Sequence, residues 1–80
     1  MHELSLIHGV LEIITASAKV HDIKQVSLIR LVVGEYYGAL PEALNFAFEA
    51  VTRDTICEGA VLELVATAGR ELYVDYYEGD

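Results

Sequence analysis

The sequence is poor in the residue types that build many familiar sites. Among its 80 residues there are one cysteine, one proline and no tryptophan, and only 5 Lys and Arg stand against 13 Asp and Glu. A single cysteine excludes an intramolecular disulfide and any paired-cysteine zinc or redox motif. The formal net charge of −8 would repel a phosphate backbone, and the few basic residues are scattered. Nucleic-acid binding is therefore not expected.

Long hydrophobic runs are also missing, although 54% of the residues are hydrophobic. The apolar runs are a few residues long, whereas a membrane-spanning helix needs about 20. The start of the chain has an acid where a signal peptide would have Lys or Arg. A chain of this size has room for one core. We expect a single domain over residues 1–80, in the cytoplasm and without membrane contact.

The first 20 residues have the periodicity of an amphipathic helix that ends at about Val20. Its expected core stripe, at three-and-four spacing, is Leu4, Ile7, Leu11, Ile14 and Ala18. A second apolar row consists of Leu6, Val10 and Ile13. We interpret this row as packing on a second helix, because a short chain needs most of its apolar surface for its core. The alternative is a docking surface for a partner protein.

A second helix is indicated by Pro41 followed by Glu42, since proline is tolerated in a first helical turn and an acid is favoured there. Its core stripe is Leu44, Ala47, Phe48 and Val51. Three segments alternate as strands do: Gln25–Gly34, about 60–67 and about 70–77. The fold class is then α+β in the order αβαββ, with two helices on one face of a three-stranded mixed sheet.

The expected connections set the pairing of these strands. The helical crossover makes the first two strands parallel, and the short turn around Ala68 and Gly69 makes the last two an antiparallel hairpin. The face under the helices should contain Ile29, Leu31, Val33, Leu62, Leu64, Leu72, Val74 and Tyr76. The opposite face should contain Val26, Leu28, Val32, Val61, Val65, Tyr73 and Tyr77, interrupted by Arg30, Glu63 and Asp75. It is apolar enough that we expect another subunit or protein segment to cover part of it.

No enzyme motif is present. The sequence has no glycine-rich phosphate loop after a strand, no HExxH and no nucleophile elbow. Cys57 is interpreted as a small, half-buried packing residue between helix and strand. His8 lies at the edge of the first helix's stripe. His21 lies near the C-terminal end of that helix, where the helix dipole favours a cationic imidazole. Both are interpreted as structural. We expect a binding protein, not an enzyme.

The chain start, Met1-His2-Glu3, is the exception. The α-amine, the backbone nitrogen of His2 once it has lost its proton, and the His2 imidazole can chelate one metal ion through fused five- and six-membered rings. The fourth donor is either the amide nitrogen or the carboxylate of Glu3. Nitrogen donors in one plane suit Ni(II) or Cu(II). By spacing alone the motif is a weak signal, because a solvated helix terminus has the same residues.

The segments "MHELSL", "VSLIRLVVGE", "PEALNFAFE" and "EGAVLEL" follow one another in the order and spacing of the HypA nickel metallochaperone family, which the chain resembles over nearly its whole length. The resemblance implies a domain that binds Ni(II) at Met1, His2 and Glu3, with His2 as the essential imidazole. It also implies delivery of the nickel for maturation of [NiFe]-hydrogenase or urease, with a HypB-type GTPase and the hydrogenase large subunit as partners. The alternative function is a structural or protein-interaction module in which His2 is incidental.

One departure from the family is large. Members have a zinc domain with two CxxC pairs between the last two strands, and here those cysteines are missing between about residues 66 and 70. We expect no structural zinc in this chain. The zinc domain is either excised or naturally absent, and the intact strands on both sides of the apparent hairpin favour excision. Such a short connection favours exchange of the last strand between two chains, so we expect a homodimer by strand exchange, or one formed through the uncovered sheet face.

Overall fold

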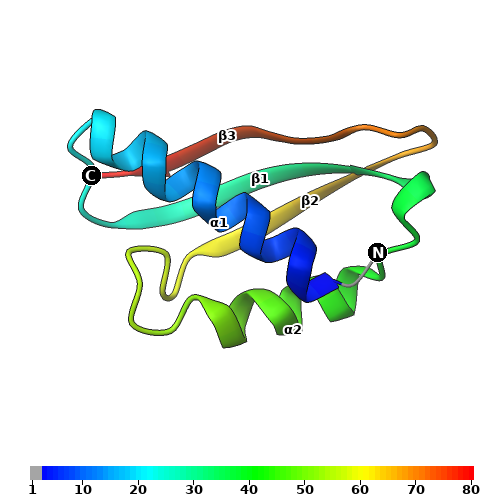
Figure 1. Ribbon diagram of the computed structural model, residues 1–80, viewed down its shortest axis with the longest axis horizontal. Coiled ribbons are helices and arrows are strands. Elements are labelled where there is room, and N and C mark those ends of the chain that lie inside the picture. Colours follow the sequence, from blue (N-terminus) through cyan, green and yellow to red (C-terminus); the bar gives the residue numbers. More distant parts are fainter. Residues whose placement is uncertain (1–2) are drawn as a thin grey trace.

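The computed structural model describes residues 3–80 and has the element order expected from the sequence. The elements are α1 (Glu3–Val20), β1 (Val26–Gly34), the short 3-10 helix η1 (Glu35–Tyr37), α2 (Pro41–Val51), β2 (Val61–Thr67) and β3 (Leu72–Gly79). Figure 1 shows the two helices beside the sheet, with α1 running along its length. The α+β fold with a three-stranded mixed sheet is confirmed. Within residues 3–80, no helix is long and apolar enough to cross a membrane.

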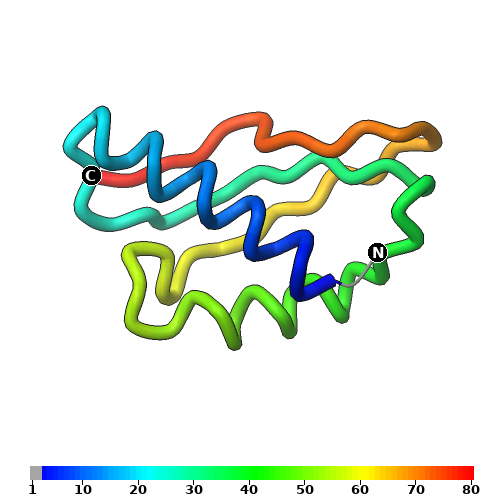
Figure 2. The backbone as a smooth tube through the Cα atoms, in the orientation of Figure 1, coloured from blue at the N-terminus to red at the C-terminus, as the bar shows by residue number. Residues whose placement is uncertain are grey.

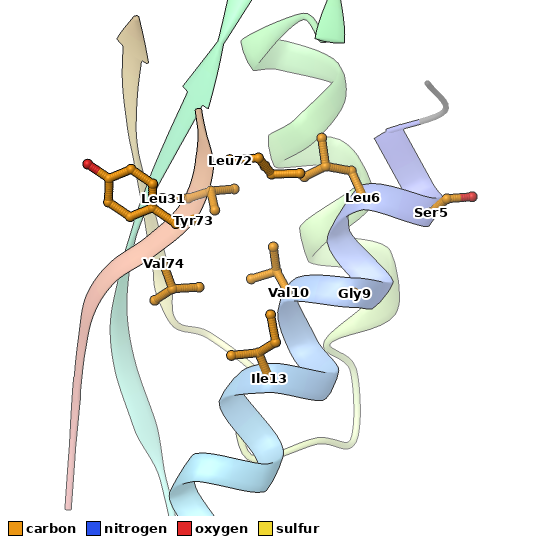
Figure 3. Close-up of a pocket in the computed structure, with 9 residues that line it drawn as sticks. All are labelled: Ser5, Leu6, Gly9, Val10, Ile13, Leu31, Leu72, Tyr73 and Val74. Carbon is orange, nitrogen blue, oxygen red and sulfur yellow. The ribbon is translucent and has the colours of Figure 1, made fainter. Parts of the chain in front are cut away.

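Helix α1 buries most of the expected stripe, with Ile7, Ile14 and Ala18 in the core, and adds two residues of the second apolar row. Leu6 and Val10 are in the core, whereas Leu4 remains 49% exposed. The row that contains Leu6 and Val10 faces β3 across a groove, as Figure 3 shows. The reason is that α1 lies over the edge of the sheet and packs against α2 at the same time, so two sides of the helix are used.

Helix α2 follows the sequence pattern closely. It begins at Pro41, a position where a backbone N–H would have no intrahelical partner, so proline loses no hydrogen bond there. The helix buries Leu44, Ala47 and Phe48. At its end the hydroxyl of Thr52 donates a hydrogen bond to the carbonyl of Phe48 at 2.7 Å. The same carbonyl also accepts the backbone N–H of Thr52 at 3.0 Å, so the side-chain bond satisfies the buried hydroxyl of Thr52.

The strand order is β2-β1-β3, so the expected hairpin between β2 and β3 is wrong. The parallel pairing of β1 with β2 is confirmed, but β3 pairs with β1 in an antiparallel ladder and lies on its other side. Figure 2 shows the connection between β2 and β3 passing over the end of β1. The central place suits β1 because its apolar residues continue on both faces: Val32 on one face and Val33 on the other are both buried.

A β-bulge in β3 reverses the predicted faces of two tyrosines. Arg30 is paired with Tyr76, but its neighbour Leu31 is paired with Val74, so Asp75 is an extra residue. Beyond it the alternation is shifted. The hydroxyl of Tyr77 lies 2.7 Å from Oγ of Ser17 on α1, which places Tyr77 on the helix face. Tyr76 is instead on the opposite face, and both assignments made from strict alternation are wrong.

A second irregularity lies near the start of β1, between the pairs of Val26 and Leu28 with β3. Val26 is 1% exposed and belongs to the core cluster, although alternation placed it on the opposite face. Its backbone N–H donates to the carbonyl of Ile56 at 2.8 Å, which joins the strand to the turn before β2. The bulge therefore turns one more apolar side chain into the core.

The connection between β2 and β3 is held at Gly34. The backbone N–H of Gly34 donates to the carbonyl of Glu71 at 2.6 Å, and the N–H of Tyr36 donates to the carbonyl of Gly69 at 3.1 Å. The hydroxyl of Thr67 donates to the Glu71 carboxylate at 2.7 Å and holds the pKa of that carboxyl below its usual range. The connection is thus fixed to the end of β1 by backbone bonds, with a side-chain bond between its two ends.

We expect Gly34→Ala to destabilise the protein by about 1–3 kcal/mol, the range for overpacking a filled site. A Cβ at this position would lie 2.6 Å from the carbonyl carbon of Gly69 and 2.9 Å from the nitrogen of Glu71. The backbone of Gly34 is extended, with φ −79 and ψ 155, so the limit is space and not dihedral angle. Urea unfolding followed by circular dichroism measures the change.

The matched control is Gly9→Ala on α1, where an added Cβ meets nothing within 4 Å. We expect this variant to be more stable by up to about 1 kcal/mol, because alanine loses less backbone entropy than glycine in a helix. Equal unfolding midpoints for Gly34→Ala and the unsubstituted protein would contradict the close approach.

Candidate metal centre

The candidate metal ligands lie at the start of α1. Glu3 is the first residue of this helix and is partly exposed. Met1 and His2 lie outside the described residues, so the predicted ligand set is only in part within the structure. The first N–H groups of an α-helix have no intrahelical partner, and the helix dipole places partial positive charge there. The negative charge of the Glu3 carboxylate is therefore stabilised at this end of the helix.

In residues 3–80, no three His, Cys, Asp or Glu side chains are grouped so that they could hold a metal ion. His8 is exposed on α1, and His21 follows the helix. Nδ1 of His21 lies 2.9 Å from the carbonyl oxygen of Ser17, so the ring donates a hydrogen bond to one of the last carbonyls of α1. This contact agrees with the structural interpretation of His21, which stays a prediction.

Cys57 is a core residue, more deeply buried than the sequence suggested. It is fully buried, and its backbone N–H donates to Oγ1 of Thr55 at 3.1 Å. Burial raises the pKa of its thiol. The thiolate is the form of cysteine that acts as a nucleophile and binds metals, so the surroundings of Cys57 disfavour both roles.

A charged cluster lies on the far face of the sheet, where the sequence pattern places Arg30, Glu63 and Asp75 without predicting their contacts. The guanidinium of Arg30 forms ion pairs with Glu63 on β2 and, at 3.3 Å, with Asp75 on β3, and it lies 5.9 Å from the ring centroid of Tyr76. Hydrogen bonding to Glu63 raises the pKa of Arg30. The parallel register pairs Arg30 with Glu63, so aligning the two strand patterns gives the first contact. The contacts on β3 depend on the bulge.

The described residues form a small α+β domain whose candidate metal ligands are at the chain start. Residues 1–72 match the family model described as "Hydrogenase/urease nickel incorporation, metallochaperone, hypA". The chain belongs to this family, as its resemblance in sequence predicted.

Curated relatives agree with the family model. The hydrogenase maturation factor HypA of Beijerinckia indica subsp. indica is 46% identical over 69 residues, which are 86% of this chain and 61% of the relative. The factor of the same name from Paracoccus denitrificans is 40% identical over 78 residues, 98% of this chain and 69% of the relative. The chain therefore spans between three fifths and seven tenths of the length of these two relatives.

A solved structure supports the fold. The solution structure of the Ni metallochaperone HypA from Helicobacter pylori superposes with a TM-score of 0.75, covering 95% of this chain and 72% of that chain. The sequence identity is 18%, so the similarity concerns the arrangement of helices and strands. The predicted fold is confirmed in this respect too.

We expect the purified chain to hold no zinc after dialysis against a chelator. Structural zinc sites are four-coordinate and rich in cysteine and histidine ligands, and the single cysteine of this chain is buried in the core. Elemental analysis by mass spectrometry measures the metal content per chain. One tightly held zinc per chain would contradict this prediction and would mean that the chain has zinc ligands other than cysteine.

Proposed function

We propose that this chain is the nickel-binding domain of a metallochaperone that binds Ni(II) at Met1, His2 and Glu3 and delivers it during hydrogenase maturation. The observation that carries the proposal is the match to a nickel-incorporation family from residue 1 onward. The beginning of α1 at Glu3 supports it, because the proposed donors then meet the end of the helix where unpaired N–H groups lie.

The chemistry of these donors fits nickel. The α-amine of Met1 and the backbone nitrogen of His2 close a five-membered ring, and the His2 backbone nitrogen and imidazole close a six-membered ring. The backbone N–H of Glu3 is among the first of the helix, so no intrahelical carbonyl competes for this nitrogen. The positive end of the helix dipole also disfavours an ammonium group and so favours the free amine. Four donors in one plane suit Ni(II).

A surface site of this kind is suited to transfer. The ligands belong to the chain terminus and the first helical turn, so a recipient can reach the ion without opening the core. The curated relatives are named hydrogenase maturation factors, which favours the hydrogenase large subunit as recipient and a HypB-type GTPase as a further partner. Urease is the other recipient that the family description includes. In this function the protein binds and passes on its cargo without catalysing a reaction.

Two features of the proposal concern the connection of residues 68–71. We infer that the family's zinc domain is missing between about residues 66 and 70. The homodimer formed by exchange of β3 stays a prediction, now for a strand that pairs with β1. Exchange would have to separate the Gly34–Glu71 backbone bond and remake it between two chains.

We expect His2→Ala to weaken Ni(II) binding by at least about a hundredfold, because it removes the imidazole and the six-membered chelate ring together. His8→Ala and His21→Ala are the controls, and we expect both to bind as the unsubstituted protein does. Titration with Ni(II), followed by the absorption band of a square-planar complex, gives the affinity. Binding should weaken as the pH falls, since protons compete for the donor nitrogens.

A single residue added before Met1 should weaken binding to a similar extent. The primary amine then moves out of the first chelate ring, and a peptide nitrogen takes its place. Comparing extended and unextended proteins in the same titration tests the ligand set separately from the family assignment. Equal affinity with the same absorption band would mean that the α-amine is not a ligand.

A further inference from the structure

The face of the sheet that the helices leave open has an ordered pattern of side chains. We call it the open face and define it by its register rows across the three strands: Val61 and Leu28 with Glu78, then Glu63 and Arg30 with Tyr76, then Val65 and Val32 with Tyr73. The middle row holds the charged cluster, and the rows on either side are mostly apolar. Figure 3 shows Tyr73 turned away from α1, in contrast to its neighbours Leu72 and Val74.

Several large side chains on the open face remain accessible. Val61 is 60% exposed, Tyr73 is 51% exposed and Tyr76 is 43% exposed. Between them, Val32 is only 5% exposed, so the accessible groups surround a filled centre. The open face therefore presents accessible aromatic and aliphatic groups beside a charged cluster, and exposed apolar side chains gathered on one face mark a contact surface.

The charges of the open face have one sign in excess. The three strands contain Arg30 as their one basic residue, and their acids are Glu63, Asp75 and Glu78. One positive and three negative charges give −2. Arg30 is already engaged by Glu63 and Asp75, so a ligand meets a negative surface, on a chain whose formal net charge is −8. Charge complementarity calls for a basic ligand.

A second copy of the chain does not meet this requirement. Two open faces in contact would bring −2 against −2, with each chain at −8, and like charges placed opposite one another oppose association. The width of the face points to the shape of the ligand. Three strands spaced about 4.8 Å apart are roughly 14 Å across, which is the space for one helix of about 10–12 Å diameter.

We propose that the open face binds a basic amphipathic helix of a partner protein. Apolar residues of that helix pack on Val61, Val32 and Tyr73, and its Lys or Arg side chains reach Glu63, Asp75 and Glu78 along the same face. The helix would form the third layer of a helix–sheet–helix arrangement, the usual way in which a sheet covers both of its faces. This contact is independent of nickel, because α1 and its start lie on the other side of the sheet.

The test is a titration of the isotopically labelled full chain with a synthetic helical peptide, followed by NMR. The probe has about 14 residues with leucine at positions i, i+3, i+4 and i+7 and lysine elsewhere on its flanks; the matched peptide has glutamate in place of lysine. We expect chemical-shift changes on β1, β2 and β3 centred on Val61, Arg30 and Tyr73. We expect the glutamate peptide to bind at least about tenfold more weakly.

Two pairs of variants separate this site from general attraction to an acidic protein. Glu78→Lys, on the open face, should weaken binding of the lysine peptide by roughly fivefold or more. Glu49→Lys makes the same charge change at an exposed position of α2 and should have little effect. Val61→Ser should weaken binding, and Phe46→Ser, at a 75% exposed position on α2, should not.

Three results would overturn the proposal. The first is a set of shift changes centred on the groove between α1 and β3, at Leu6, Val10 and Leu72. The second is an equal loss for Glu78→Lys and Glu49→Lys, which would mean binding through net charge alone. The third is a concentration-dependent dimer in light scattering, with NMR shift changes on dimerisation that map to the open face. This result would make a second copy of the chain the occupant.

Discussion

The enclosure of β1 between its two neighbours is the constraint on which the rest of the structure depends. β1 buries Ile29 and Leu31 under the helices and Val32 on the other face, and both β2 and β3 are paired only with it. Because β2 and β3 lie on opposite sides of β1, the chain between them has to cross the end of that strand. Gly34 allows this crossing, since its lack of a side chain lets the backbone of Gly69 and Glu71 approach.

The same arrangement separates two surfaces. The helices cover one face of the sheet, so Glu3, at the start of α1, belongs to the helix layer. The charged centre of Arg30, Glu63 and Asp75 belongs to the opposite face. A protein that passes on a metal ion has to hold its cargo and its partner together. In the proposed function, the two faces on either side of one sheet would allow nickel and a partner helix to be bound simultaneously.

The bulge at Asp75 links the core to the open face. Without this extra residue, strict alternation would turn Tyr76 toward the helices and Tyr77 away from them. With it, Tyr77 reaches Ser17 on α1 and Tyr76 lies beside the guanidinium of Arg30. One irregular residue on an edge strand therefore contributes a contact to the core and also shapes the charged cluster on the other face.

The sequence by itself determined the elements, the family and the candidate ligands. Apolar periodicity, Pro41 and the alternation of β1 are local properties, and they predicted the helices and strands close to their observed bounds. The tertiary structure alone decided which strand is central, that Leu6 and Val10 join the buried stripe of α1, and on which face Val26, Tyr76 and Tyr77 lie. These depend on pairings between distant segments, and a short connection fits a hairpin as well as a crossing over Gly34. A bulge shifts the alternation by one residue without any signal in the local pattern, because only the partner strand defines which residue is extra.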